Sequence, residues 1–184
     1  MNQGSKALIF NEKQIEIVLN RLAAQIRELR HFHPDLLVIG VQPRGIHLAG
    51  RLCQLASGIS GPLLQPGKLD PTFFRDDFRT GKKLLVPAEA DLPADLTNKP
   101  VLLIDDVVFT GRTTRAAIDA LLNHGRPAWI KLMVLVNRHL EREIPIAVDF
   151  EGFRLDLDST QKIELHLSET PGNSRLTITD YEQL

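Results

Sequence analysis

The sequence predicts an α/β fold in which a mostly parallel central sheet is flanked by helices. Largely apolar runs at 35–41, 101–105 and 129–136 are typical of strands that are buried on both faces of a sheet. Helical patterns of apolar residues follow the first two runs after short turns. Strands and helices that alternate in this way favour a parallel sheet with right-handed crossovers.

The first predicted helix follows a short strand-like stretch, ALIF. Asn11 is expected to cap this helix, because Gln14 stands three residues later, as a capping box requires. Apolar residues then recur at helical spacing and predict the packed face: Ile15, Val18, Leu22, Ile26 and Leu29. Two further helices are expected, one after the turn PRG and one after the loop that follows residue 105, with Gly125 as the C-terminal cap of the last.

Residues 60–100 interrupt this pattern with Pro, Gly and charged residues, so we expect an arm or hood that leaves the core. Two stretches near the end of the chain, KIELHLSE and RLTITD, alternate apolar and polar residues as half-buried strands do. The sequence contains no repeat, low-complexity tract or linker, so residues 1–184 are predicted to form one domain.

Composition argues against several classes of protein. The net charge is −1, which does not favour binding of nucleic acid through a general basic surface. No apolar run approaches the roughly 20 residues that span a bilayer, so we expect a cytoplasmic protein without a membrane partner. The single Cys53 cannot form an internal disulfide and is expected to be a buried apolar residue. The six histidines show no metal-ligand spacing, which argues against a dedicated zinc site.

The most informative stretch is LLIDDVVFTGRTTRAA, residues 102–117. An apolar strand here meets two adjacent carboxylates, Asp105 and Asp106, at the sheet edge where open α/β folds bind ligands. The loop after them combines a glycine, hydroxyl groups and the N–H groups of a helix start, which together favour a phosphate. Its residues are Thr110, Gly111, Thr113 and Thr114. A ribose 5-phosphate would use both halves, because its hydroxyls can donate to the carboxylates while its phosphate lies in the loop.

Two simpler or rival interpretations of this stretch are weaker. A lone pair of aspartates is more often a solvated strand end beside a threonine-capped helix, but the whole string favours a ligand site. Gly40 and Gly45 have the spacing of a P-loop, yet that motif requires Lys and then Ser or Thr where Ile46 and His47 stand. No G-x-G-x-x-G follows a strand either, which argues against a dinucleotide-binding fold.

The stretch VLLIDDVVFTGRTTRAAIDAL is similar to the phosphoribosyl-pyrophosphate signature of the type I phosphoribosyltransferases. Further stretches in the family's order, among them GVQPRGIHLAGRL, LDPTFFRDDF and REIPI, resemble the bifunctional pyrimidine-operon attenuation regulators that have uracil phosphoribosyltransferase activity. This resemblance covers most of the chain. It implies the type I phosphoribosyltransferase fold with a β-arm or hood, and a homodimer or higher homo-oligomer.

The resemblance also implies transfer of the 5-phosphoribosyl group from phosphoribosyl pyrophosphate to a nucleobase, with Mg²⁺ on the diphosphate and ribose oxygens. Asp105 and Asp106 are then the catalytic carboxylates and metal ligands, which orient the sugar and stabilise positive charge on it. Arg44 and Gly45 match the family's pyrophosphate loop, and Arg75 matches its mobile arm. The residues expected to bind phosphoribosyl pyrophosphate are Arg44, Gly45, Arg75, Asp105, Asp106, Thr110, Gly111, Arg112, Thr113 and Thr114.

The expected base-binding region departs from the family. Uracil enzymes of this branch continue as Asp-Arg-Gly-His-Arg-Glu-Leu-Pro-Ile, whereas this sequence reads NRHLEREIPI, with Asn137 in place of the acid and one residue added. Asn137 and Arg138 are expected to contact the base, with uracil as the first choice. The stretch VDFEGFRLDL also resembles the purine-holding segment of hypoxanthine-guanine phosphoribosyltransferases, with Phe150 as a stacking residue, so a 6-oxopurine is the alternative.

Two non-catalytic alternatives stay open. One is a nucleotide-sensing, RNA-binding attenuator of pyrimidine genes, in which Arg21, Arg27 and Arg30 would join a basic face. Helices with scattered arginines are ordinarily solvated, however, so RNA is a partner that the sequence does not favour. The other alternative is a vestigial enzyme that binds nucleotide without turnover, and it is suggested by Asn137.

Overall fold

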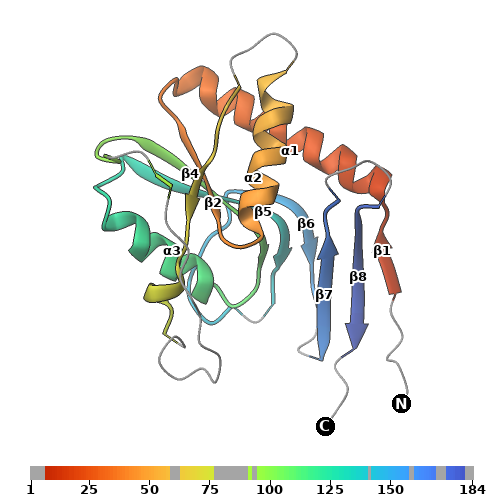
Figure 1. Ribbon diagram of the computed structural model, residues 1–184. Helices are drawn as coiled ribbons and strands as arrows, with labels where there is room; N and C mark the ends of the chain where they lie inside the picture. Colours follow the sequence, from red (N-terminus) through yellow and green to blue (C-terminus); the bar gives the residue numbers. More distant parts are fainter. Residues whose placement is uncertain are drawn as a thin grey trace.

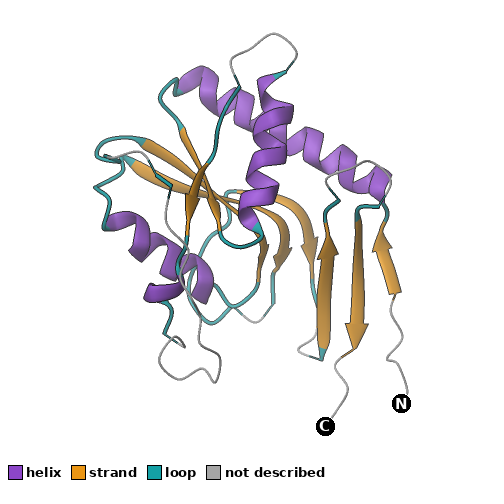
Figure 2. Ribbon diagram, viewed as in Figure 1, coloured by secondary structure: helices purple, strands orange, loops and turns teal. Residues whose placement is uncertain are grey.

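The structure is a computed structural model that describes residues 7–58, 63–76, 91–92, 95–140, 142–157, 160–168 and 173–180. These residues form a five-stranded sheet, a smaller three-stranded sheet and three α-helices (Figures 1 and 2). The α/β prediction is therefore confirmed. In the described part of the chain, every helix is too short or too polar to cross a membrane.

The larger sheet is parallel throughout and has the strand order β3-β2-β4-β5-β6. Its strands are β2 (Leu37–Val41), β3 (Gly67–Leu69), β4 (Pro100–Val108), β5 (Trp129–Arg138) and β6 (Phe150–Leu155). Because all five strands run in one direction, their carboxyl ends meet at a single edge, which is where α/β sheets of this kind bind ligands.

The smaller sheet is antiparallel and joins the two ends of the chain. It consists of β1 (Ala7–Phe10), β8 (Arg175–Asp180) and β7 (Gln161–His166), in that order. The two alternating stretches near the end of the sequence thus form strands, as predicted. In Figures 1 and 2 this sheet stands beside the larger one, below the start of helix α1.

Three helices cover the parallel sheet: α1 (Glu12–Phe32), α2 (Gly45–Ser57) and α3 (Arg112–Leu122). Helix α1 begins with the predicted capping box. The N–H of Gln14 donates to the side chain of Asn11 over 3.1 Å, and the Gln14 side chain accepts from the N–H of Asn11 over 2.9 Å. Helix α3 ends earlier than expected, because Asn123 rather than Gly125 caps it.

The core has one layer on each face of the parallel sheet. Alternate residues of β4 enter different layers: Leu102 and Ile104 pack with α1 and α2, whereas Val101 and Leu103 pack with α3. Figure 2 shows α1 and α2 on one side of the sheet and α3 on the other. Cys53 lies in the first layer, so the prediction that it is a buried apolar residue is confirmed. Burial raises the pKa of its thiol to about 12.

The predicted arm is described at its two ends. It departs after β3 through a short 3-10 turn, Thr72–Phe74, and returns where Asp91 pairs antiparallel with Lys68. The backbone N–H of each residue donates to the carbonyl of the other, over 2.8 and 3.0 Å. The rest of the predicted arm, including residues 77–90, lies outside the described residues.

Candidate active site

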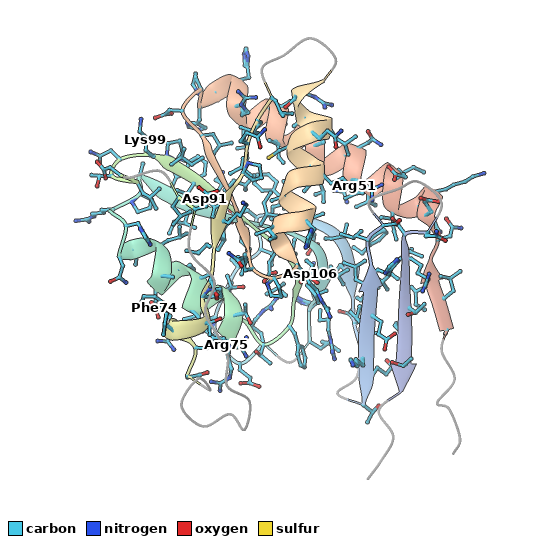
Figure 3. The ribbon with its side chains drawn as sticks, viewed as in Figure 1. Arg51, Phe74, Arg75, Asp91, Lys99 and Asp106 are labelled. Carbon is cyan, nitrogen blue, oxygen red and sulfur yellow. The ribbon has the colours of Figure 1, made fainter. Side chains whose placement is uncertain are left out.

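Two buried carboxylates lie near the carboxyl end of the central strand β4. The apolar run that predicts this strand ends at residue 105, but the strand itself continues to Val108 through its pairing with β5. Asp105 and Asp106 are therefore strand residues, only 6% and 8% exposed. Figure 3 shows Asp106 in the interior near the start of α2.

Each carboxylate is held by the backbone that follows it. The N–H of Asp106 donates to Oδ1 of Asp105 over 2.9 Å, and the N–H of Val107 donates to Oδ1 of Asp106 over 2.8 Å. The second oxygen of Asp106, Oδ2, is buried without a hydrogen-bond partner among the described residues. Nη1 of Arg44 lies 3.7 Å from it, which is an ion-pair distance but too long for a hydrogen bond. Asp106 thus retains an acceptor for a ligand.

The electrostatics of this pair favour a cation or a hydroxyl donor. Burial raises the pKa of Asp105 well above its ordinary value, and the neighbouring charge of Asp106 raises it further. Placing two negative charges in this interior without compensation is costly, so a ligand that donates hydrogen bonds or brings a cation relieves an unfavourable arrangement.

The loop between β2 and α2 approaches the carboxylates closely. A Cβ atom at Gly45 would lie 2.5 Å from the carbonyl oxygen of Ile104 and 3.3 Å from Oδ1 of Asp105. Gly45 begins helix α2 and does not have a positive φ. The requirement for glycine here is therefore close approach rather than a left-handed backbone conformation.

The turn between β4 and α3 has the features of a phosphate site. Gly111 adopts a left-handed conformation with φ of 90°, which lets the chain enter the helix sharply. No side chain caps the helix and no acidic residue stands in its first turn. The hydroxyl oxygen of Thr114 is buried without a hydrogen-bond partner in the described part of the chain. A helix start with these properties favours an anion.

Side chains from two other segments already contact the start of α3. Arg112 forms ion pairs with Asp76, at the base of the arm, and with Glu143, in the loop after β5. Both carboxylates raise the pKa of Arg112. Nη1 of Arg75 donates to the hydroxyl of Thr113 over 3.3 Å. Arg112 therefore serves to join the arm and the β5–β6 loop to this helix, a role that the sequence does not reveal.

A polar network marks the carboxyl end of β5. Asn137 is 4% exposed, and its amide nitrogen donates to Oε2 of Glu151 over 2.6 Å. Its amide oxygen accepts from Nη2 of Arg142 over 2.7 Å, and Nη1 of Arg142 donates to the carbonyl of Phe109. Desolvation lowers the pKa of Arg142. Asn137, Arg142 and Glu151 line a cavity of about 440 Å³ together with His139, Ile146, Ala147, Val148, Asp149 and Arg154.

The other two predicted base-binding residues occupy different positions. Arg138 is buried, with its guanidinium 3.8 Å from the centre of the Phe109 ring, and so packs beneath the turn between β4 and α3. Phe150 does not line the cavity. Its ring packs against the core layer of α1 and α2, with Nζ of Lys131 5.8 Å from its centre. Core packing thus explains Phe150, whereas Arg142 and Glu151 are cavity residues that sequence reasoning missed.

Two of the three arginines considered for an RNA-binding face, Arg21 and Arg27, have partners within the chain. Nη2 of Arg21 donates to the carbonyls of Glu151 and Gly152, over 3.0 and 2.7 Å. Nη1 of Arg27 donates to the carbonyl of Leu55 over 3.1 Å. These bonds connect α1 to β6 and to α2, so both side chains contribute to the packing of the helix.

Comparison with known proteins identifies the family. The model of the phosphoribosyl transferase domain matches residues 7–168. The chain belongs to the phosphoribosyl transferase family. The proteins named "Bifunctional protein PyrR" from Bacillus mycoides and Bacillus cereus are each 39% identical to this phosphoribosyltransferase over 177 residues, which cover 95% of this chain and 98% of theirs. Resemblance to this branch is thereby confirmed.

Solved structures of phosphoribosyltransferases share the fold. A hypoxanthine-guanine phosphoribosyltransferase from Bacillus anthracis has a TM-score of 0.62 and 19% identity, and the match covers 81% of this chain and 83% of that one. A hypoxanthine phosphoribosyltransferase from Trypanosoma cruzi, in complex with IMP, has a TM-score of 0.61 and 18% identity over 84% of this chain and 78% of that one. The type I phosphoribosyltransferase fold is confirmed by these matches.

Proposed function

We propose that this phosphoribosyltransferase transfers the 5-phosphoribosyl group from phosphoribosyl pyrophosphate to uracil, giving UMP and pyrophosphate. The observation that carries the proposal is the buried pair Asp105 and Asp106, which stands between the helix start at Arg112 and the loop of Arg44 and Gly45. A ribose on the carboxylates would have one phosphate site on each side. Few ligands other than a phosphoribosyl diphosphate carry phosphate groups at both ends of a ribose.

In the reaction, the bond from C1 of the ribose to the diphosphate oxygen breaks and a bond from C1 to a ring nitrogen of the base forms. The base loses the proton of that nitrogen, and the electron pair of the broken bond leaves with the pyrophosphate. If the leaving group departs early, positive charge develops on the ribose ring. Asp105 and Asp106 would stabilise this charge and orient the sugar hydroxyls without forming a covalent bond.

The chain's other residues would hold the two phosphate ends. The N–H groups at the start of α3 and the hydroxyl of Thr114 would receive the 5-phosphate. Arg44 would hold the diphosphate, since its side chain is 69% exposed and its guanidinium lies beside Asp106. Arg75, which contacts Thr113, would bring the base of the arm toward the same ligand. An arm that closes over the site excludes water and limits hydrolysis of the sugar.

Magnesium fits the donor set of this site. Asp105 and Asp106 are oxygen ligands of the type that Mg²⁺ prefers, and Oδ2 of Asp106 has no hydrogen-bond partner among the described residues. No group of three or more metal-binding side chains occurs in the described part of the chain. The two aspartates would therefore hold the ion jointly with oxygens of the diphosphate and ribose, and the ion would neutralise charge on the leaving group.

The choice of base rests on the relatives and on Asn137. The PyrR resemblance favours uracil, whereas the fold shared with hypoxanthine phosphoribosyltransferases keeps a 6-oxopurine as the second candidate. The cavity that Asn137 lines is close to the carboxylates, because Asn137 pairs with Val108, two residues after Asp106. Regulation through RNA stays a prediction, and the internal bonds of Arg21 and Arg27 do not favour it.

Pyrophosphate release tests this proposal directly. We would mix the protein with phosphoribosyl pyrophosphate and Mg²⁺ and offer uracil, hypoxanthine, guanine, xanthine and adenine separately. Release that depends on uracil supports the proposal, and release with hypoxanthine or guanine alone replaces uracil with a purine. If the sugar diphosphate binds but no base releases pyrophosphate, the protein is a sensor rather than a catalyst.

A further inference from the structure

The loop after β5 packs directly on the turn between β4 and α3. The backbone N–H groups of Glu143 and Ile144 both donate to the carbonyl oxygen of Thr110, over 3.0 and 3.1 Å. A Cβ atom at Gly111 would lie 3.2 Å from the carbonyl oxygen of Ile144 and 3.2 Å from Cγ1 of Ile146. The loop is thus bound to the turn at the residues that immediately precede helix α3.

Arg142 adds a side-chain connection that reaches two different places. Its Nη1 donates to the carbonyl oxygen of Phe109 in the turn, and its Nη2 donates to the amide oxygen of Asn137 over 2.7 Å. Its Cδ lies 3.4 Å from the position that a Cβ atom of Gly111 would take. Asn137 and Arg142 also line the cavity at the end of β5. One side chain therefore contacts both the turn and the cavity.

The orientation of the Asn137 amide depends on this contact. An amide group can be placed in two ways, which exchange its oxygen, an acceptor, with its nitrogen, a donor. Here the nitrogen donates to Oε2 of Glu151 over 2.6 Å and the oxygen accepts from Arg142. With an acceptor on one side and a donor on the other, a single orientation satisfies both. Arg142 thereby determines which polar atoms Asn137 presents to a ligand in the cavity.

A guanidinium group is suited to connect two segments in this way. It is planar and directs its donors in fixed directions. Because the two terminal nitrogens of Arg142 bind acceptors in different segments, movement of one acceptor is transmitted to the other. The bond to Phe109 holds the peptide that leads into helix α3, whose first N–H groups have no side-chain cap. The direction of these N–H groups therefore depends on how the turn is held.

We propose that Arg142 is a positioning residue that aligns two ligand sites. It orients Asn137 toward the base, and it holds the turn whose N–H groups receive the 5-phosphate. This inference rests on the proposed function in placing the 5-phosphate at the start of α3 and the base in the cavity. Arg142 acts through Asn137 and the backbone of Phe109, so it need not contact the reacting atoms.

Calorimetric titration tests both ends of this connection. Ribose 5-phosphate probes the turn, and uracil or hypoxanthine, each added in the presence of saturating ribose 5-phosphate, probes the cavity. No transfer occurs in these mixtures, because ribose 5-phosphate has no diphosphate leaving group. We expect Arg142→Met to bind ribose 5-phosphate and the base each about tenfold more weakly than the wild type, since each site loses a hydrogen bond from a charged donor.

Two further variants separate this role from the effect of charge and from the cavity alone. Arg142→Lys keeps the positive charge but has one nitrogen in place of the two that bind different acceptors, so it should restore at most one of the two affinities. Arg154→Met is the matched comparison, because Arg154 lines the same cavity and contacts His139. It should leave the affinity for ribose 5-phosphate unchanged.

Several results would overturn the inference. They are wild-type affinity of Arg142→Met for either ligand, recovery of both affinities in Arg142→Lys, an equal loss of ribose 5-phosphate binding in Arg154→Met, and failure of the wild type to bind ribose 5-phosphate or either base. Thermal unfolding shows whether each variant is folded. If Arg142→Met is not, Arg142→Lys decides, since weaker binding of at least one ligand supports the inference and wild-type binding of both overturns it.

Failure of the proposed function is recognised separately. Base-dependent release of pyrophosphate from phosphoribosyl pyrophosphate is measured on the wild type alone. If ribose 5-phosphate and a base bind but no pyrophosphate is released, the proposed transfer fails while the role of Arg142 stands on the titrations.

Discussion

Two neighbouring turns at the carboxyl edge of the parallel sheet satisfy their polar groups in opposite ways. On either side of the turn from β4 to α3, Oδ2 of Asp106 and the hydroxyl of Thr114 are buried without hydrogen-bond partners among the described residues. One strand away, the amide of Asn137 has a partner at both its nitrogen and its oxygen. The first turn thus keeps polar atoms that a ligand could satisfy, whereas the polar atoms of the second are satisfied within the chain.

The difference has an energetic meaning. A buried polar atom without a partner costs about 1–3 kcal/mol, which a ligand that supplies the missing hydrogen bond can recover. If the proposed ligand binds, the carboxylate side of the site therefore gives up stability in the free protein for affinity. The Asn137 side holds its donors and acceptors in fixed directions, which is the property needed to distinguish one base from another.

The largest expected effect on activity comes from removing the two carboxylates. Replacement of both aspartates, Asp105→Asn with Asp106→Asn, should lower kcat by roughly 10³-fold or more, because the charges that stabilise the sugar are lost. The thermal midpoint should stay similar or rise. Steady-state kinetics and thermal unfolding check these two outcomes, and preserved activity would contradict the proposed role of the carboxylates.

The same variant has a defined pH signature. Since folding raises the pKa of Asp105, the folded state favours its protonated form, and this residue's contribution to stability falls as pH rises above its ordinary pKa of 3.8 toward the raised value. The asparagine variant lacks this loss. Its advantage in thermal midpoint over the wild type should therefore be small near pH 4 and grow toward neutral pH. A difference that stays constant with pH would show that ionisation of the buried carboxylates does not cause it.

A smaller effect, on the free energy of unfolding, is expected from changes at Asn137 and Glu151. Asn137→Asp would place a second carboxylate at hydrogen-bond distance from Glu151 and should lower the free energy of unfolding by about 1–3 kcal/mol at neutral pH. Adding Glu151→Gln should restore stability, because the new amide can donate to the carboxylate at position 137. Denaturant unfolding of the single and double variants measures this coupling, and additive effects of the two changes would show that the pair does not interact.

The smallest effect concerns the connection between the two turns. Arg112→Gln removes the ion pairs with Asp76 and Glu143, and should raise the KM for phosphoribosyl pyrophosphate by roughly a few-fold, since exposed pairs contribute little. Arg115→Gln is the matched control, because Arg115 pairs with Asp119 on the same helix over 3.0 Å. Equal effects of the two substitutions on KM would show that the ion pairs of Arg112 with Asp76 and Glu143 do not contribute to substrate binding.

Local patterns predicted the parts of the molecule that depend on neighbouring residues. The capping box at Asn11 and Gln14, the parallel core and the edge position of Asp105 all follow from spacing or from apolar runs. The full length of β4 could not be predicted in this way, because charged residues end an apolar run while strand pairing continues through them. The contact of Asn137 with Glu151 joins adjacent strands across 14 residues of chain, so no local pattern contains it.

Glu151 and Gly152 have a consequence for which substitutions strand β6 tolerates. A Cβ atom at Gly152 would lie 2.4 Å from the carbonyl oxygen of Leu135 and 2.8 Å from Cγ1 of Val18, so any larger residue there would displace α1 from the sheet. The preceding residue, Glu151, directs its side chain to Asn137 and to the cavity that both residues line. One strand thus carries a glycine that its contacts with β5 and α1 hold fixed beside a residue that faces a cavity, so the two neighbouring positions are constrained by different surroundings.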